Sequence, residues 1–136
     1  MSFIAWNDRL SVGVEIIDSD HKKLVGMLNE LYDAIADGTS KEILGDLLDR
    51  LVEYTSVHFA REESFFSRTG YPGAEAHKFE HANMIAWLVE MRTRLKSGSA
   101  MGPSLELVNY LKDWLFDHIL GSDMEYGPHL NAMGIC

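Results

Sequence analysis

The chain of 136 residues has one cysteine and no long apolar run, and each shortage excludes a class of protein. Cys136, the last residue, can neither close a disulfide within the chain nor belong to a cysteine-rich metal cluster. No apolar stretch approaches the roughly 18 residues that span a bilayer, and the N-terminus lacks the basic-then-apolar pattern of a signal peptide. We therefore expect a cytoplasmic protein that does not insert into membranes.

Positive charge is also scarce. Lys and Arg number 12 against 21 Asp and Glu, which gives a formal net charge of −9 at pH 7. A field of this sign repels nucleic acid and anionic lipid, so neither is expected as a partner. The hydrophobic fraction of 46% is ordinary for a globular protein, and a chain of this length can bury a full core as one domain.

Apolar residues recur at helical spacing in four segments, which predicts an all-α, up-down-up-down antiparallel four-helix bundle. The expected single domain over 1–136 consists of an extended N-terminal arm over 1–17, helices over about 19–37, 40–66, 74–97 and 104–120, and a C-terminal tail over 124–136. The residues expected to cap or begin these helices are Asp18 or Ser19, Thr39 with Glu42, and Pro103 with Ser104.

Five of the six histidines and two carboxylates form a candidate metal-ligand set on these helices. The set is His21, His58, Glu62, His77, His81, His118 and Asp123. Because residues four apart on a helix project in the same direction, His58 and Glu62 can reach one site, and His77 and His81 can do the same. Glu62 beside Glu63 could also be an exposed acidic patch, but Glu62 is in phase with Leu51 and His58 whereas Glu63 is not.

The last pair of the set does not fit an ideal helix. His118 and Asp123 are five residues apart, about 140° out of phase. Gly121 lies between them and permits local unwinding or a single wide turn, so we predict a helical irregularity there. His129, the sixth histidine, lies off every apolar stripe and is predicted to be a surface residue.

Each element of the set also has a plainer explanation. A lone histidine on an apolar stripe, such as His21, is more often a hydrogen-bonded core residue, and paired histidines also occur on solvated faces. However, burying five imidazoles and two carboxylates without partners would cost several kcal/mol for each unsatisfied ionised group. Metal coordination removes that cost. One zinc ion needs four ligands and this set offers seven, which favours two metal ions bridged by Glu62 and Asp123.

The ligand types narrow the chemistry. Nitrogen-rich ligands without thiolate suit iron, zinc, copper or manganese. Carboxylate-rich diiron bundles carry Glu-x-x-His on two helices, whereas no histidine of this chain has a glutamate three residues before it. Neutral imidazoles leave less negative charge to stabilise high-valent iron, which favours reversible oxygen binding over attack on a substrate.

These motifs closely resemble those of the hemerythrins, the bacterial members in particular, over essentially the whole chain. The matching segments are Trp6-Asn7-Asp8, Val14-x-x-x-Asp18-x-x-His21, His58-x-x-x-Glu62, His77-x-x-x-His81 and His118-x-x-x-x-Asp123. The resemblance implies a non-haem diiron centre bridged by Glu62, Asp123 and an oxo or hydroxo group. It implies that one iron is bound by His77, His81 and His118. The other iron, bound by His21 and His58, would keep an open position for dioxygen.

The resemblance also implies a function. We expect reversible dioxygen binding for oxygen carriage, storage or delivery, without enzyme activity, by a monomer whose protein partner is unknown. A diiron oxidase or peroxidase, an oxygen- or redox-sensing module, and a protein for iron storage or nitric-oxide handling would use the same residues. An apolar wall should keep water and protons from the open position. The candidates for this wall are Leu24, Phe59, Trp114, Leu115 and Ile119, whereas Met84 and Trp87 are interpreted as core packing.

Overall fold

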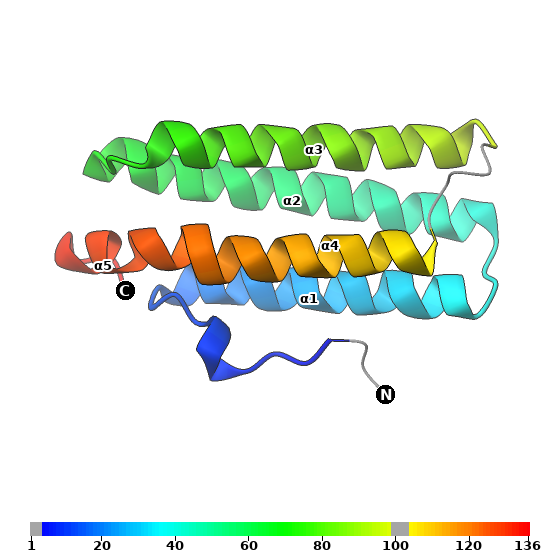
Figure 1. Cartoon of the computed structure of the whole chain (residues 1–136), viewed down its shortest axis with the longest axis horizontal. Coiled ribbons are helices and arrows are strands. Elements are labelled where there is room, and N and C mark those ends of the chain that lie inside the picture. The colour runs from blue at the N-terminus through cyan, green and yellow to red at the C-terminus, as the bar shows by residue number, and fades with distance from the viewer. Residues whose placement is uncertain (1–3, 99–103) are drawn as a thin grey trace.

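Four long helices form the body of the molecule in the computed structural model, which describes residues 4–98 and 104–136 (Figure 1). They are α1 (Glu15–Ala36), α2 (Lys41–Thr69), α3 (Ala74–Lys96) and α4 (Leu105–Asp117). A π-helical segment, η2 (His118–Asp123), joins α4 to α5 (Met124–Ala132), and η1 (Asp8–Leu10) is a 3-10 turn in the N-terminal arm. No described residue lies in a strand. The predicted four-helix bundle is confirmed.

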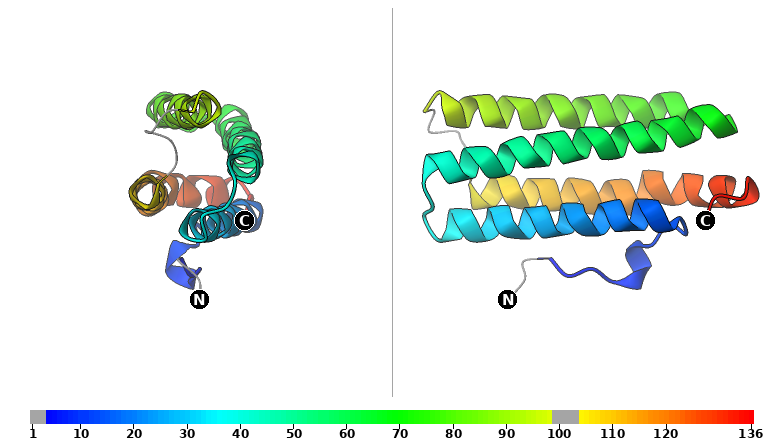
Figure 2. Two further views of the ribbon diagram at one scale, coloured as in Figure 1. Left: turned by 90° about the vertical axis from the view of Figure 1, so that its right-hand side faces the viewer. Right: turned by 180° about the vertical axis from the view of Figure 1, so that it is seen from behind.

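The four helices pack around one apolar core. Seen along the bundle in Figure 2, α2 lies between α1 and α3, and α4 closes the ring beside α1. The buried side chains repeat at helical spacing, as Leu24, Leu28 and Leu31 do on α1. This arrangement directs one face of every helix to a common interior, where buried ligands from different helices can meet.

The first helix begins at Glu15, four residues before the predicted start. Asp18 does not cap it, because its carboxylate accepts hydrogen bonds from the Ser11 hydroxyl (2.5 Å) and the Val12 amide (2.8 Å). Asp18 thus lies inside the first turn, where a negative charge favours the helix dipole, and it ties the preceding loop to the helix. The residue before the helix, Val14, provides no side-chain cap.

The second helix starts after a cap one residue later than predicted. Ser40, and not Thr39, is the N-cap, and its hydroxyl accepts the amide hydrogen of Ile43 (3.5 Å). This helix extends to Thr69 and ends at Gly70, whose φ of 65° suits the left-handed cap conformation. In the fourth helix Ser104 caps Leu107 as predicted, whereas Pro103 lies outside the described residues.

The predicted C-terminal tail is mostly the helix α5, which is a correction. Tyr126 and Leu130, four residues apart, are both completely buried, and this burial outweighs the hydrogen bond that Pro128 cannot make. The backbone of the N-terminal arm packs directly against α5, because a Cβ added to Gly127 would lie 2.3 Å from the Val12 carbonyl oxygen. The Asn131 amide donates to the Gly13 carbonyl at 2.9 Å. The arm and α5 therefore close one end of the bundle together.

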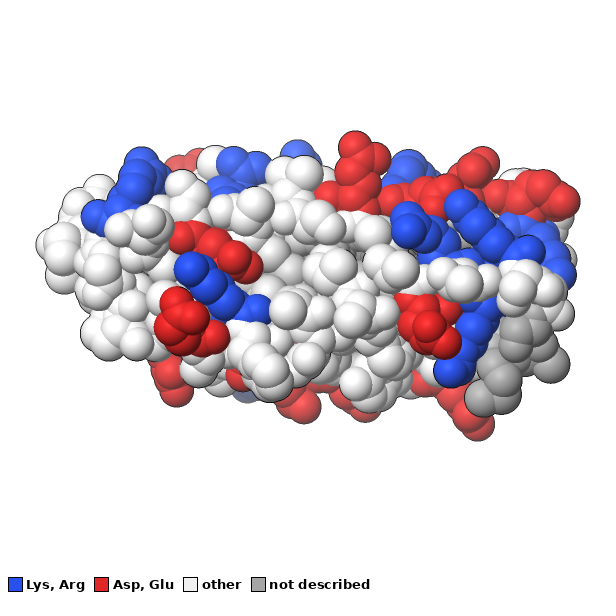
Figure 3. Space-filling model, turned by 90° about the horizontal axis from the view of Figure 1, so that it is seen from above, with Lys and Arg blue, Asp and Glu red and all other residues white. Residues whose placement is uncertain are grey.

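Charge is unevenly distributed along the surface. On the face over α3 shown in Figure 3, charged side chains gather toward the two ends and are sparse in the middle. Residues 81–89 of this helix include no Asp, Glu, Lys or Arg. Within the described part of the chain, no helix has the length and hydropathy needed to cross a bilayer.

Candidate metal centre

The seven residues singled out from the sequence converge on one buried cluster near the α5 end of the bundle. His21 lies on α1, His58 and Glu62 on α2, His77 and His81 on α3, and His118 and Asp123 on η2. Their exposed fractions run from 0% for His21 to 6% for His118. Four helical segments that are distant in the chain thus supply one set of nitrogen and oxygen donors.

The donors divide into two groups that share a carboxylate. The three-histidine group comprises His77, His81 and His118 with Glu62. The two-histidine group comprises His21 and His58 with Glu62. Within each group, one donor atom per residue lies within 4.8 Å of the donor atoms of the other residues. Glu62 Oε1 is 3.1 Å from His58 Nε2 and 3.3 Å from His81 Nε2. Glu62 therefore lies between the two groups.

Asp123 is the second link between the groups. Its Oδ1 lies 3.0 Å from His77 Nε2 and 3.1 Å from His118 Nε2, whereas its Oδ2 lies 3.1 Å from His21 Nε2. The two oxygens of one carboxylate thus face different groups. This is the arrangement expected of a carboxylate that bridges two cations.

The position of Asp123 depends on the predicted helical irregularity, which is confirmed. Residues His118–Asp123 form a π-helix, and the Met124 amide donates to the carbonyl of Ile119, five residues earlier. A turn of this kind has more residues than an α-helical turn, so side chains five apart come to the same side. His118 and Asp123 therefore both face the cluster.

The cluster contains buried polar atoms that no described residue satisfies by a hydrogen bond. They include Nε2 of His21, His77, His81 and His118, Oε1 of Glu62 and both carboxylate oxygens of Asp123. The contacts between them are short, but they are not aligned as hydrogen bonds. Buried groups of this kind are rare because they carry a desolvation cost. Cations between the groups would satisfy these atoms, so the donor set fits a metal centre.

Three further carboxylates lie against outer nitrogens of the histidines. Asp20 and Glu63 are hydrogen-bonded to them, whereas the Glu80 contact is a short ion pair that is not aligned as a hydrogen bond. Asp20 Oδ2 lies 2.8 Å from Nδ1 of His58, Glu63 Oε2 lies 2.8 Å from Nδ1 of His81, and Glu80 Oε2 lies 2.9 Å from Nδ1 of His118. A carboxylate on Nδ1 fixes the tautomer that leaves the Nε2 lone pair free for a metal. Helical phase alone missed these residues, and Glu63 in particular is out of phase with the ligand face of α2. Each of them lies next to a candidate ligand in the sequence, a signal that could have found them.

The carboxylates and histidines of the metal-free cluster shift one another's pKa values. Burial lowers the pKa of His58, but the negative charge of Glu62 and the hydrogen bond to Asp20 outweigh it and raise the pKa to about 10. Burial raises the pKa of Glu62, but the interactions with His58 and His81 bring it down to about 2. Glu62 also accepts a short hydrogen bond from the Tyr126 hydroxyl, which favours the anionic form of this carboxylate.

His129 lies apart from the cluster. Its Nε2 is 3.1 Å from both the carbonyl oxygen and the hydroxyl of Thr69, at the end of α2. The residue is half-buried, so the prediction of a surface histidine was only partly right. Its contacts connect α5 to α2 and include none of the candidate ligands.

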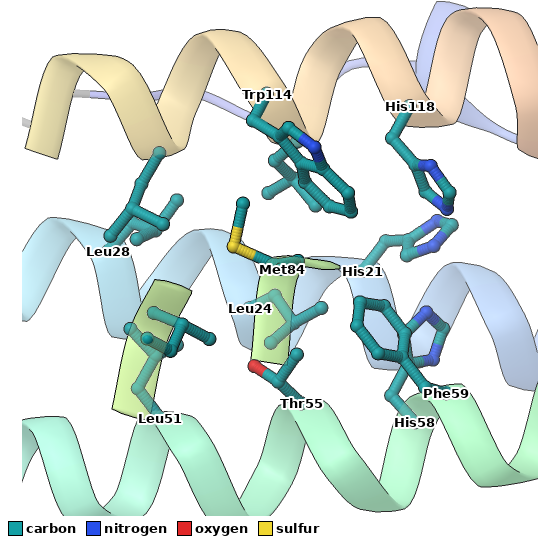
Figure 4. Close-up of a pocket in the computed structure, with 13 residues that line it drawn as sticks. His21, Leu24, Leu28, Leu51, Thr55, His58, Phe59, Met84, Trp114 and His118 are labelled. Carbon is teal, nitrogen blue, oxygen red and sulfur yellow. The ribbon is translucent and has the colours of Figure 1, made fainter. Parts of the chain in front are cut away.

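An apolar pocket adjoins one side of the cluster (Figure 4). It touches both histidines of the two-histidine group, His21 and His58, but only His118 of the three-histidine group. Four of the five residues expected in the apolar wall line it: Leu24, Phe59, Trp114 and Leu115. Ile119 does not line the pocket, although it is completely buried, and Met84 lines it in addition to packing in the core.

Comparison with known proteins identifies the family. The model of the hemerythrin HHE cation binding domain matches residues 12–130. The chain belongs to the hemerythrin family. Membership implies non-haem iron binding, which the histidine and glutamate cluster fits.

Individual hemerythrins are similar over nearly the whole chain. The bacteriohemerythrin of Stenotrophomonas maltophilia is 36% identical over 132 residues, which cover 97% of this chain and 84% of that protein. The bacteriohemerythrin of Methylococcus capsulatus is 32% identical over 97% of this chain and 100% of that protein. A crystal structure of wild-type hemerythrin superposes with a TM-score of 0.90 at 30% identity and covers 95% of this chain and 98% of that one.

Proposed function

We propose that this hemerythrin binds dioxygen reversibly at a diiron centre, for carriage, storage or delivery of the gas, as a cytoplasmic monomer. In this proposal His77, His81 and His118 hold one iron ion and His21 and His58 hold the other. Glu62 and Asp123 would hold both ions, together with an oxo or hydroxo group. The pair of ferrous ions supplies the electrons that dioxygen needs in order to bind.

The position of the pocket carries the proposal. It lies against the two-histidine group, where fewer protein donors leave room for an external ligand. The pocket has room of about 30 Å³ for a water-sized guest, which suits a diatomic molecule and excludes a large substrate. The gas therefore has a small apolar place beside the metal position with fewer ligands.

The surroundings favour binding over turnover. Among the described residues that line the pocket, Thr55 is the only polar one apart from histidines of the cluster, so this lining includes no carboxylate, lysine or tyrosine to move protons. Phe59 stacks on His81 with ring centroids 3.7 Å apart, and Trp114 stacks on His118 at 4.5 Å. These rings hold the imidazoles in place and make most of the pocket wall apolar, which slows oxidation of the iron.

The test is iron analysis joined to visible spectroscopy. Anaerobically reduced protein should contain two irons per chain, develop an absorption band in air and lose it when oxygen is removed. One iron per chain would contradict the diiron assignment. Rapid bleaching with release of peroxide would contradict reversible binding and favour the diiron oxidase or peroxidase alternative.

Two histidine variants provide a matched pair for the ligand assignment. His58→Ala should lose the iron of the two-histidine group and with it the oxygen-dependent band. His129→Ala should keep both irons and the band, because this histidine contacts Thr69 and none of the seven candidate ligands. Equal iron contents in the two variants would contradict the ligand set.

A further inference from the structure

The apolar pocket contains one hydroxyl that the metal centre does not use. Thr55 lies on α2, three residues before His58, and its exposed fraction is 5%. The other twelve residues that line the pocket are three histidines of the cluster and nine apolar or aromatic residues. Figure 4 shows the Thr55 side chain pointing into the pocket between Leu51 and His58.

The Thr55 hydroxyl differs from other hydroxyls on these helices. Three of them donate to the carbonyl four residues earlier: Ser56 to Val52 (2.9 Å), Thr69 to Phe65 (2.8 Å) and Thr93 to Val89 (2.9 Å). Thr55 makes no such bond to Leu51 and has no other hydrogen-bond partner among residues 4–98 and 104–136. Its oxygen is accessible from the pocket, so a hydrogen-bonding guest there would supply the partner that the protein does not.

The pocket is large enough for such a guest. Its room of about 30 Å³ exceeds the roughly 10–15 Å³ that one water molecule needs. We propose that the Thr55 hydroxyl binds one water molecule in the pocket, one helical turn from His58, and that this water sets the rate of oxidative loss of the bound gas. The second part rests on the proposed function, whereas the water site does not.

The chemistry of the loss explains why one water matters. When dioxygen leaves as hydrogen peroxide, it takes one electron from each of the two ferrous ions and two protons, and both ions remain ferric. The apolar and aromatic side chains of the wall supply no protons. A water molecule held on Thr55 brings exchangeable protons into the same enclosed space as the gas, so removing its anchor should slow the loss.

Two substitutions at this position separate the hydroxyl from the shape of the side chain. Thr55→Val keeps the volume and removes the hydroxyl, and Thr55→Ser keeps the hydroxyl. In crystals of the iron-loaded proteins, an ordered water should lie within hydrogen-bond distance of the hydroxyl in the wild type and in T55S, and be absent from T55V. Under xenon pressure, T55V should bind more xenon in the pocket. A pocket without this water in the wild type, or equal xenon occupancy in wild type and T55V, would overturn the proposed site.

The kinetic arm measures the decay of the oxygenated band. T55V should decay severalfold more slowly than the wild type, T55S should decay at a rate close to it, and all three should contain the same amount of iron. Ser56→Ala, a change to an exposed hydroxyl on the same helix, is the control and should have no effect. An ordered water together with an unchanged decay in T55V would overturn its role in oxidation. Absence of a reversible band in the wild type would instead contradict the proposed function, and the crystallographic arm would still test the water site.

Discussion

Replacement of Asp20 by asparagine tests whether the outer carboxylates control the metal centre. Asp20 is 3% exposed, and its Oδ2 lies 2.8 Å from His58 Nδ1 and 2.8 Å from Arg61 Nε, while its Oδ1 accepts the Tyr54 hydroxyl at 2.5 Å. Burial raises the pKa of Asp20, but these hydrogen bonds lower it well below its usual range, so the group is a fixed anion. Asp20→Asn keeps the shape and removes the charge that makes His58 a stronger ligand.

The size of the effect follows from the role of such partners at other metal sites. Loss of a carboxylate behind a ligating histidine typically weakens metal affinity about 10- to 100-fold, which corresponds to about 1.4–2.8 kcal/mol. Arg61 adds little to this cost, because its side chain is 34% exposed and water can replace the lost partner. The weakening should fall on the two-histidine group, to which His58 belongs.

The assay is a chelator competition with the reduced protein, read as iron content per chain and as the amplitude of the oxygen-dependent band. The iron content of Asp20→Asn should fall toward one ion per chain at a chelator concentration at which the wild type keeps its iron. Glu63→Gln, which changes the partner of His81, should instead weaken the three-histidine group. Asp33→Asn, at an exposed position of α1, is the background control. If Asp20→Asn keeps the same iron content per chain as Asp33→Asn at this chelator concentration, the reasoning is refuted.

Three other changes test the fold and the charges of the centre. Gly127→Ala should lower the free energy of unfolding, measured by denaturant titration, by about 1–3 kcal/mol, because the added Cβ would lie 2.3 Å from the Val12 carbonyl oxygen. Gly26→Ala is the control: a Cβ there would have no neighbour within 4 Å, so this change should stabilise the helix by up to about 1 kcal/mol. Tyr126→Phe removes a hydrogen bond to the Glu62 carboxylate and should cost the metal-free protein about 1.5–3 kcal/mol. An unchanged melting temperature would count against this bond. The raised pKa of His58 stabilises the metal-free fold below pH 6.5, and this stability is lost as the pH rises toward about 10, so the melting temperature should fall between pH 7 and 10. A melting temperature that rises over this interval would contradict the assignment.

Local spacing predicted much of the centre because most of its donors follow regular helical geometry. The pair His77 and His81 needed only the four-residue repeat, and the five-residue gap before Asp123, with Gly121 inside it, was enough to predict an irregular turn. These features depend on contacts between near neighbours in the chain. The fold class followed from the same repeat, applied to the apolar residues.

The features that were missed depend on contacts between segments distant in the chain. Asp20 contacts His58 across 38 residues, and helical phase gives no information on such a pair. The helix α5 was predicted as a tail because Tyr126 is buried against Phe66, Tyr71 and His77, which lie far from it in the chain. Ile119 was assigned to the pocket from helical phase, yet the π-helix that begins at His118 changes the direction in which it faces.

The enclosure of the centre by both ends of the chain has a consequence for biosynthesis. Asp123 and Tyr126 lie near the C-terminus, and the arm packed against α5 comes from the first residues. A nascent chain on the ribosome has His21, His58 and Glu62 long before it has Asp123, so its set of donors stays incomplete until η2 has been made. Loading of the complete centre must therefore follow synthesis of η2, and a chain cut directly after His118 should fail to load fully although every histidine of the cluster remains.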